Sequence, residues 1–335
     1  MKDRVFIVTG ANGFLGNNIV RILLEKNLGE VRALVLPNDN VQALKGLDCK
    51  IYKGDVTDIN SLNEIFDIGD KEIFVIHCAA IVYIKSKFNQ KVYDVNVNGT
   101  KNIINKVLEK NCKMVYVSSV HAIPELPNKE IITEIKDFNP DNVVGMYAKT
   151  KAETANYVLK MVKEKDLNAS IVHPSGIIGP GDFGTSHLTA LIIDFASGKL
   201  TACVNGGYDF VDVRDVALGT INACFKGEKG ECYILSNRYI TVKELLDNVS
   251  EVINKKKIKT ILPMWFAKLT APLSEMYYTL LKRPPLYTKY SLFTLTSNSN
   301  FSSEKARECL DYKTRDLKDT VRDTIKWLKE QGRIK

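Results

Sequence analysis

Tyr147 and Lys151 are the first residues whose types and spacing could do chemistry. They stand four residues apart in the stretch GMYAKTKAET, residues 145–154, among residues that favour helices. Positions i and i+4 share one face of a helix. An unperturbed tyrosine titrates near ~10, and a cation within ~4–6 Å favours the phenolate and lowers that pKa. The pair could therefore pass a proton, although 14 Tyr and 47 Lys+Arg make such a pair easy to find by chance.

A glycine-rich loop near the start of the chain is the second candidate. The stretch VTGANGFLG places Gly10, Gly13 and Gly16 after a short apolar run and at the start of a helical pattern. Glycines here allow a tight turn and a close approach of the backbone to a pyrophosphate, while the helix amino terminus offers unpaired N–H groups. A plain strand-to-helix turn is the simpler interpretation, but the position between a strand and a helix predicts a dinucleotide site.

The elements that must position these residues alternate between strand and helix patterns in the first half of the chain. The expected strands are residues 4–10, 31–36, 49–56, 73–80, 113–119 and 169–176. The expected helices are residues 15–26, a helix that starts at Ser61 and continues to 66, and residues 98–110 and 147–165. This alternation predicts right-handed crossovers and an α/β fold of the doubly wound Rossmann type, with a parallel sheet covered on both faces.

The alternation weakens after about residue 175, where Gly- and Pro-rich segments, a strand that turns into a helix (208–225) and a further strand (231–237) follow. We therefore expect two domains. The dinucleotide-binding domain would comprise residues 1–174 and 206–236, and a smaller, discontinuous substrate domain would comprise 175–205 and 237–335.

Together these motifs resemble the extended branch of the short-chain dehydrogenase/reductase superfamily, the NAD-dependent epimerase/dehydratase family. Gly-x-x-Gly-x-x-Gly comes first and Tyr-x-x-x-Lys follows on a later helix. Further matching stretches are GDVTD (54–58), HCAA (77–80), VNVNGT (95–100), VSS (117–119), HPSGIIGPGD (173–182), VDVRDVA (211–217) and the final segment 301–332. Within the branch, ALVLP (33–37), VRDVA (213–217) and RPPLYTKY (283–290) are most similar to dihydroflavonol-reductase-like and 3β-hydroxysteroid-dehydrogenase-like proteins.

The resemblance implies roles for individual residues. Tyr147 would be the acid/base that exchanges a proton with a carbonyl or alcohol, Lys151 would support it and hold the nicotinamide ribose, and Ser119 would bind the substrate oxygen. The residues expected around the cofactor are Gly10, Asn12, Gly13, Phe14, Leu15 and Gly16 in the phosphate loop, Leu36 after the second strand, Asp55 and Val56 at the adenine, Cys78, Ala79 and Ala80 at the ribose and phosphates, Pro174 and Gly176 at the nicotinamide, and Tyr147 and Lys151 themselves.

The choice between NAD and NADP stays open at this stage. NAD users of the branch tend to carry an acidic residue at the end of the second strand for the ribose 2′-hydroxyl, and NADP users an arginine. This chain has Leu36 where the arginine would stand. Asn38, Asp39 or Lys45 could decide the matter.

Three functions compete on this fold. The leading hypothesis is an oxidoreductase that moves hydride between a nicotinamide cofactor and a carbonyl or secondary alcohol. The second is a nucleotide-sugar epimerase, although Ile123 and Pro124 stand where epimerases usually show Tyr-Gly. Elimination is disfavoured because Val120 and His121 replace the two carboxylates of the dehydratases. The third is a non-catalytic dinucleotide sensor, a class that typically loses the Tyr or the Lys.

The substrate is expected to be an apolar cyclic or aryl compound, because the segment from Leu262 to Thr296 is rich in aromatic residues. The residues concerned are Met264, Trp265, Phe266, Tyr277, Tyr278, Tyr287, Tyr290 and Phe293. Core packing is the plainer interpretation of the same residues.

Composition narrows the remaining possibilities. The net charge of +8 comes without an arginine-rich arm, so we expect no nucleic-acid partner. The seven cysteines are scattered without a C-x-x-C, which is typical of a reducing cytoplasm, and the four histidines have no ligand spacing, so no metal site is expected. The chain runs directly into a strand pattern and has no long apolar run, so neither a secretory signal nor a membrane span is expected. The resemblance favours a monomer or homodimer.

Overall fold

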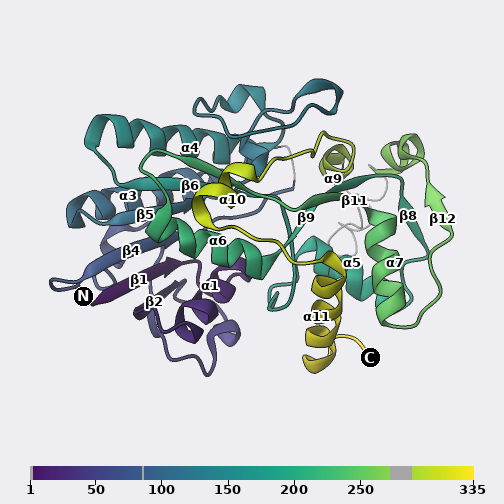
Figure 1. The fold of residues 1–335 in the computed structure, drawn as a ribbon, viewed down its shortest axis with the longest axis horizontal. Helices are drawn as coiled ribbons and strands as arrows, with labels where there is room; N and C mark the ends of the chain where they lie inside the picture. Colours follow the sequence, from purple (N-terminus) through teal and green to yellow (C-terminus); the bar gives the residue numbers. More distant parts are fainter. Residues whose placement is uncertain (1–2, 85–86, 272–288) are drawn as a thin grey trace.

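A computed structural model describes residues 3–84, 87–271 and 289–335 of the chain. Its centre is a sheet of seven parallel strands in the order β10-β6-β5-β4-β1-β2-β3 (Figure 1). The strands are β1 (Arg4–Thr9), β2 (Glu30–Val35), β3 (Lys50–Lys53), β4 (Glu72–His77), β5 (Lys113–Val117), β6 (Ala169–Pro174) and β10 (Cys232–Leu235). The order 3-2-1-4-5-6 is that of the dinucleotide-binding fold, so the predicted fold class is confirmed.

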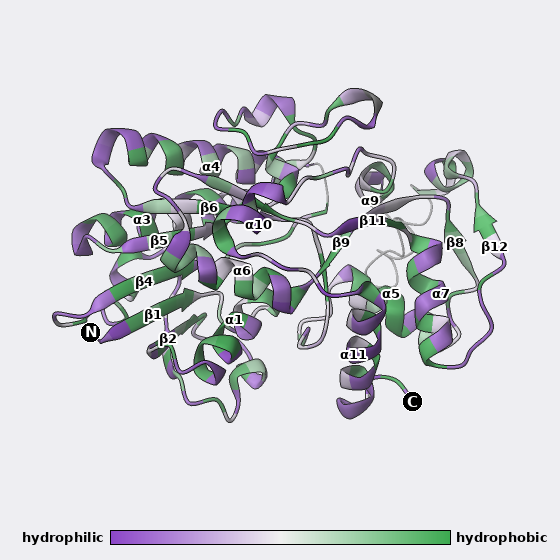
Figure 2. Cartoon of the chain, in the orientation of Figure 1, coloured by the Kyte–Doolittle hydropathy of each residue, from purple (hydrophilic) through white to green (hydrophobic). Residues whose placement is uncertain are grey.

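Both faces of this sheet are buried, because neighbouring residues of one strand enter different cores. In β1, Phe6 and Val8 join one hydrophobic cluster and Ile7 joins the other, as the two-residue period of a strand requires. The first cluster includes residues of α1 (Phe14–Glu25) and α6 (Val213–Lys226), and the second includes residues of α3 (Gly99–Lys110) and α4 (Met146–Lys165). Figure 2 shows the strands as mainly hydrophobic ribbons between helices of mixed character.

A second group of elements lies beside the sheet, on the right of Figure 1. Its three-stranded sheet has the order β11-β9-β7, and β8 pairs with β12. The strands are β7 (Gly176–Ile178), β8 (Ala202–Val204), β9 (Gly207–Asp212), β11 (Arg238–Thr241) and β12 (Thr260–Leu262). The helices are α5 (His187–Ala196), α7 (Val242–Val252), α9 (Lys289–Thr294) and α11 (Leu317–Glu330).

The division into two domains at residues 174/175, 205/206 and 236/237 stays a proposal. One late element returns to the first part: α10 (Glu304–Leu310) contributes Ala306 and Leu310 to the hydrophobic cluster that α6 also enters. Among the described residues, no helix is long and apolar enough to cross a membrane.

The prediction of a helix that starts at Ser61 is wrong. The structure has a 3-10 turn at Ile59–Leu62, and the side chain of Asp58 caps it by accepting from the Asn60 N–H. Ser61 Oγ instead donates to the carbonyl oxygens of Asp55 and Asp58. A serine that bonds the backbone before it stabilises a turn rather than a helix start.

The helix expected over 98–110 is longer at its amino end. A short helix, α2 (Gln90–Tyr93), passes through one wide turn of π-helix at Asp94–Asn98 directly into α3. Such wide turns are frequent at functional sites, and this one carries the buried side chain of Asn96.

Candidate active site

The loop between β1 and α1 has the geometry of a phosphate cradle. Gly10 has φ +62°, and a Cβ there would lie 2.9 Å from the backbone of Ala79. A Cβ on Gly16 would lie 2.2 Å from the Gly10 carbonyl oxygen. Gly13 caps α1 without any side-chain hydrogen bond, so the first N–H groups of the helix are not satisfied by a cap. Gly10 and Gly16 are therefore required by close backbone approaches, and the helix end presents donors and positive potential.

The other residues of this loop differ in their surroundings. Leu15 is buried in the core, so only its backbone faces the loop, whereas Phe14 is partly buried at the start of α1. Asn12 donates from Nδ2 to the Asp39 carboxylate at 3.0 Å. Leu36, directly after β2, is 44% exposed. The structure therefore brings Asp39, rather than Leu36, into hydrogen-bonding contact with the glycine loop.

The residues expected at the adenine and ribose follow β3 and β4. Asp55 is held in a turn, because its carboxylate accepts from the N–H and hydroxyl of Thr57 at 2.9 and 2.8 Å. Val56 is buried against Gly99. After β4, the Ala79 N–H donates to Thr9 Oγ1 at 3.1 Å. Cys78, Ala79 and Ala80 thus pass next to the glycine loop.

Ser119, Tyr147 and Lys151 come together at the carboxyl end of β5. Ser119 follows this strand and caps the next 3-10 turn. Tyr147 lies in the first turn of α4, close enough to the Ser119 hydroxyl for that group to act on the pKa of the phenol. Lys151, one turn later, is 3% exposed and donates from Nζ to the Val117 carbonyl at 2.7 Å. Its Nζ lies 6.0 Å from the centroid of the Tyr147 ring.

Pro174 and Gly176 lie at the end of β6 and the start of β7. Pro174 ends β6, the strand next to β5, and His173 bonds the Ser119 carbonyl through Nδ1 at 3.0 Å. Gly176 begins β7, and a Cβ there would lie 2.8 Å from the Phe210 ring. His173 therefore borders Ser119 from the next strand, and Pro174 and Gly176 follow it in the chain.

The electrostatics of the pair differ from the expectation. Burial raises the pKa of Tyr147 to about 12, and the hydrogen bond with Ser119 opposes this rise. Burial lowers the pKa of Lys151 to about 7. We expected the lysine to lower the tyrosine pKa, and that direction is wrong for this structure, because burial disfavours both charged forms. Tyr147 consequently holds its proton at neutral pH.

Asn96 is a residue of this region to which the sequence analysis gave no role. Its side chain binds both the N–H and the carbonyl of Ile81, at 2.8 and 3.1 Å, and donates to Thr150 Oγ1 at 3.1 Å. It thereby ties the loop after β4 to the helix that carries Tyr147 and Lys151. In the sequence, the only sign of this residue was its place in the VNVNGT stretch, and that stretch does not show that the side chain is buried.

The expected aromatic wall is only partly at this site. Tyr290 of α9 is 9% exposed and packs against Gly145, the residue that caps α4. Trp265 is 68% exposed and Phe266 is 39% exposed, so neither is buried in a pocket. Met264 contacts a small separate core, and Phe293 is partly buried. Three further expected residues lie outside the described residues: Tyr277, Tyr278 and Tyr287.

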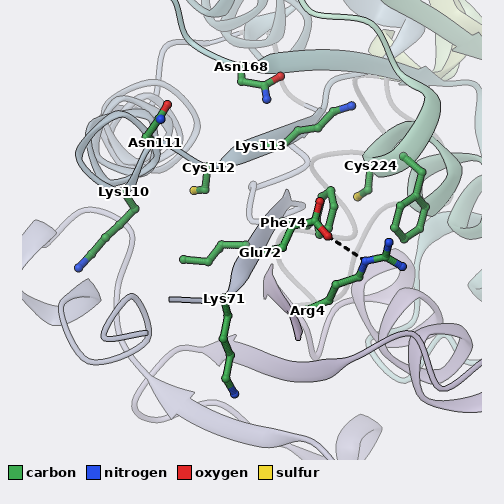
Figure 3. A pocket seen from close by; sticks show the side chains of 12 residues that line it. Arg4, Lys71, Glu72, Phe74, Lys110, Asn111, Cys112, Lys113, Asn168 and Cys224 are labelled. Atoms are coloured by element: carbon green, nitrogen blue, oxygen red, sulfur yellow. Dashed lines mark hydrogen bonds and ion pairs between the residues drawn. The ribbon is translucent and has the colours of Figure 1, made fainter. Parts of the chain in front are cut away.

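A large cavity lies at the opposite edge of the sheet (Figure 3). It measures about 820 Å³ and is lined by residues at the amino ends of strands, among them Arg4, Glu72 and Lys113. Ligands of parallel α/β sheets bind at the carboxyl ends. This cavity is therefore separate from the group formed by Ser119, Tyr147 and Lys151.

Comparison with known proteins gives consistent matches over the full length. The family model described as "NAD dependent epimerase/dehydratase family" matches residues 6–235. Sterol demethylase protein B of Methylococcus capsulatus is 30% identical, over 98% of this chain and 99% of that protein. 3beta-hydroxysteroid-dehydrogenase/decarboxylase isoform 1 of Arabidopsis thaliana is 26% identical, over 99% of this chain and 82% of that protein.

Solved structures show the same similarity over nearly the whole chain. The crystal structure of gox2253 superposes with a TM-score of 0.85 at 31% identity, and 99% of each chain is covered. Reductases, dehydrogenases and an epimerase all occur among the relatives. Several solved structures of the same fold are complexes with NAD.

Proposed function

The chain belongs to the NAD-dependent epimerase/dehydratase family, the extended short-chain dehydrogenases/reductases, and we propose that it is a reductase or dehydrogenase acting on a carbonyl or secondary alcohol. The observation that carries the proposal is the meeting of Ser119, Tyr147 and Lys151 beside the glycine loop, where a proton donor and a dinucleotide would be neighbours. The family acts on small molecules, and the substrate is of this kind.

The loop at Gly10, Gly13 and Gly16 fits a dinucleotide, since it packs closely against the backbone of Ala79 and leaves the first N–H groups of α1 without a side-chain cap. A bound nicotinamide cofactor would supply or accept hydride. The N–H groups of the loop would hold its phosphates, Asp55 and Val56 would border its adenine, and Cys78–Ala80 its ribose and phosphates. Lys151 would hold the nicotinamide ribose, with Pro174 and Gly176 around the nicotinamide.

The hydrogen bond from Asn12 to Asp39 favours NAD over NADP. It fixes a carboxylate next to the glycine loop, in the segment after β2 that reads the adenosine ribose in this fold. The 2′-phosphate of NADP carries negative charge, which a fixed carboxylate repels. Arg21, a cation of α1, is already engaged with the Ala43 carbonyl at 2.7 Å.

Tyr147 would act as the acid of a reduction. Because its pKa is about 12, it carries a proton at neutral pH and can give it to the substrate oxygen as hydride reaches the carbon. The Ser119 hydroxyl would hydrogen-bond the same oxygen. Lys151 would place positive charge near the phenolate that remains.

The substrate class proposed is an apolar cyclic or aryl compound. The His121 ring packs against Tyr147 and also contacts the rings of Tyr208 and Tyr290, so flat aromatic surfaces border the site. Two relatives carry names that refer to sterols or steroids.

An epimerase is the second candidate, because one relative is a UDP-glucose 4-epimerase, 28% identical over 73% of this chain. An enzyme of this kind returns the hydride to the same substrate, so it gives no net oxidation of the cofactor. A non-catalytic sensor is less well supported, because Tyr147 and Lys151 are both kept.

The test is a titration of the purified protein with NADH and with NADPH, followed by nicotinamide fluorescence, and then a panel of aryl and alicyclic ketones. Tyr147→Phe should bind cofactor and lose turnover, while Tyr157→Phe, on the same helix, should keep both. Binding without reduction of any ketone would favour the epimerase, and absence of binding would refute the glycine-loop argument.

A further inference from the structure

The helical segment over residues 264–271 carries its large apolar side chains outward. It follows β12 and lies just above that strand at the right of Figure 1. Its inner face presents Ala267 and Ala271, which are fully buried and belong to a small hydrophobic core. Its outer face carries Trp265, which is 68% exposed, and Leu269, which is 69% exposed. These two residues stand four apart and therefore share one face of the helix.

Two neighbouring apolar side chains are exposed as well. The ring of Phe266 meets the Trp265 ring edge-on at 5.8 Å and is 39% exposed. Ile261, on the strand that leads into the helix, is 42% exposed. A helix on the surface of a globular protein normally turns its apolar side chains toward the core. A group of large apolar side chains that faces water instead marks an interaction site.

The chain around these side chains is strongly basic. Residues 252–271 include five lysines and no acidic residue. Two of the lysines are engaged: Lys257 pairs with Glu251 at 2.8 Å, and Lys255 donates to the Ala196 carbonyl.

The other three lysines are Lys256, Lys259 and Lys268. All three are exposed, and none forms a hydrogen bond or an ion pair with a described residue. Lys268 lies on the same helix as the exposed rings, one turn after Trp265. The surface therefore joins an apolar face to positive charge that has no counterpart within the described residues.

This combination favours an anionic lipid surface over a second copy of the chain. A two-fold symmetric dimer sets the same surface patch of both copies against each other. The lysines of one copy would then face the lysines of the other, and like charges repel. A bilayer with anionic lipids offers an apolar layer to the rings and negative headgroups to the lysines. Tryptophan is also favoured at the boundary between lipid and water.

We propose that the segment 264–271 docks the protein on the surface of a membrane that contains anionic lipids. Trp265, Phe266 and Leu269 would enter the boundary between headgroups and acyl chains, to a depth of ~5–10 Å, and the three unpaired lysines would meet the headgroups. Docking of this kind is peripheral and requires no helix that crosses the bilayer. The inference goes beyond the proposed reductase function and does not depend on it.

Tryptophan fluorescence gives a direct measurement. The chain has two tryptophans, Trp265 and Trp327, and Trp327 is partly buried against the Phe183 ring at 5.3 Å. Trp327→Phe therefore leaves Trp265 as the only emitter. Its emission should shift to shorter wavelength on addition of phosphatidylcholine vesicles that contain about 30% phosphatidylglycerol, and should not shift with phosphatidylcholine alone.

Sedimentation with the same vesicles measures the affinity of the variants. The charge variant, Lys256→Gln/Lys259→Gln/Lys268→Gln, should bind the anionic vesicles about a hundredfold more weakly, because each lysine near the headgroups contributes to binding. A control variant loses the same charge elsewhere, by replacement with glutamine of three exposed lysines of α4: Lys160, Lys163 and Lys165. This control should bind like the wild type.

The apolar part of the surface is tested in the same assay. Trp265→Ser/Leu269→Ser should bind about tenfold more weakly or less, because two large side chains no longer enter the lipid. The control, Phe88→Ser, removes a ring that is 62% exposed in another part of the chain and should keep the wild-type affinity. The variants change exposed side chains, so each should keep the wild-type Tm.

Other occupants of this surface predict different results. Absence of any shift with the anionic vesicles would overturn the inference. Equal binding to both kinds of vesicle, or an equal loss in the α4 control, would show that the lysines around the helix have no specific role and would also overturn it. A shift of the Trp265 emission that depends on protein concentration without vesicles would assign the surface to a second copy of the chain and refute the lipid assignment.

Discussion

Replacing Lys151 by methionine should stabilise the folded protein at neutral pH. Lys151 is 3% exposed, and burial lowers its pKa from the ordinary 10.5 to about 7. When the pKa of a lysine is lower in the folded protein than in the unfolded protein, the lysine destabilises the fold. This destabilisation is complete at pH values below the folded pKa, and it disappears as the pH rises through the unfolded pKa. The destabilisation is about 4 kcal/mol at pH 7 and about 2 kcal/mol at pH 9.

The substitution also removes a hydrogen bond. Lys151 Nζ donates to the Val117 carbonyl at 2.7 Å. An unsatisfied buried acceptor costs about 1–3 kcal/mol. We therefore expect Lys151→Met to gain about 1–3 kcal/mol at pH 7, which corresponds to a rise in Tm of about 2–4 °C, and to gain nothing at pH 9.

Thermal unfolding followed by circular dichroism measures the change in Tm at pH 7 and at pH 9. Lys149→Met is the matched control, because Lys149 is exposed on the same helix and its variant should change stability little at either pH. The variant at 151 should also lose NADH binding, which would show that a costly cation is kept for its function. A lower Tm at pH 7, or a difference that does not depend on pH, would refute the reasoning.

The remaining predictions concern the cofactor loop and its supports. Asp39→Asn should strengthen NADPH binding about tenfold relative to NADH, because it removes a fixed negative charge; unchanged relative affinities in a fluorescence titration would disprove the role of Asp39. Gly16→Ala should lower the free energy of unfolding in urea by about 3 kcal/mol, because its Cβ would lie 2.2 Å from a carbonyl oxygen. Gly69→Ala should leave the free energy of unfolding unchanged, because a Cβ at Gly69 would meet only open space. Asn96→Ala should lower the free energy of unfolding by about 2–4 kcal/mol and lower kcat, since three hydrogen bonds of a buried side chain disappear. A loss of stability no larger than that of Asn98→Ala, at an exposed position, would contradict this.

The parallel sheet could be predicted from the sequence because its strands are short apolar runs, each followed by a helical pattern. The strands β1, β3, β5, β6 and β10 lie within the expected ranges, and β2 and β4 each begin one residue before the expected range. The helix expected from Ser61 failed because its hydroxyl bonds the backbone before it, and such local competition is not visible in a periodic pattern.

The candidate site was predictable only where a spacing carried the information. Tyr147 and Lys151 share a helix face, so four residues of sequence were enough to pair them. His121 and Tyr208 are 87 residues apart, and their meeting depends on how β9 lies beside the turn after β5. The direction of the Tyr147 pKa was missed for a related reason, since burial depends on packing that no local motif reports.

The most direct test of the central claim is the fate of the hydride. The wild type and Tyr147→Phe would be incubated with an aryl ketone that the wild type reduces and with NADH that carries deuterium at the transferable C4 position, and the product would be analysed by mass spectrometry. We expect one deuterium on the alcohol carbon of the wild-type product, NAD released in equal amount, and neither result with Tyr147→Phe. Reduction by the wild type without deuterium in the product, or equal labelling by the variant, would contradict hydride transfer with Tyr147 as the acid.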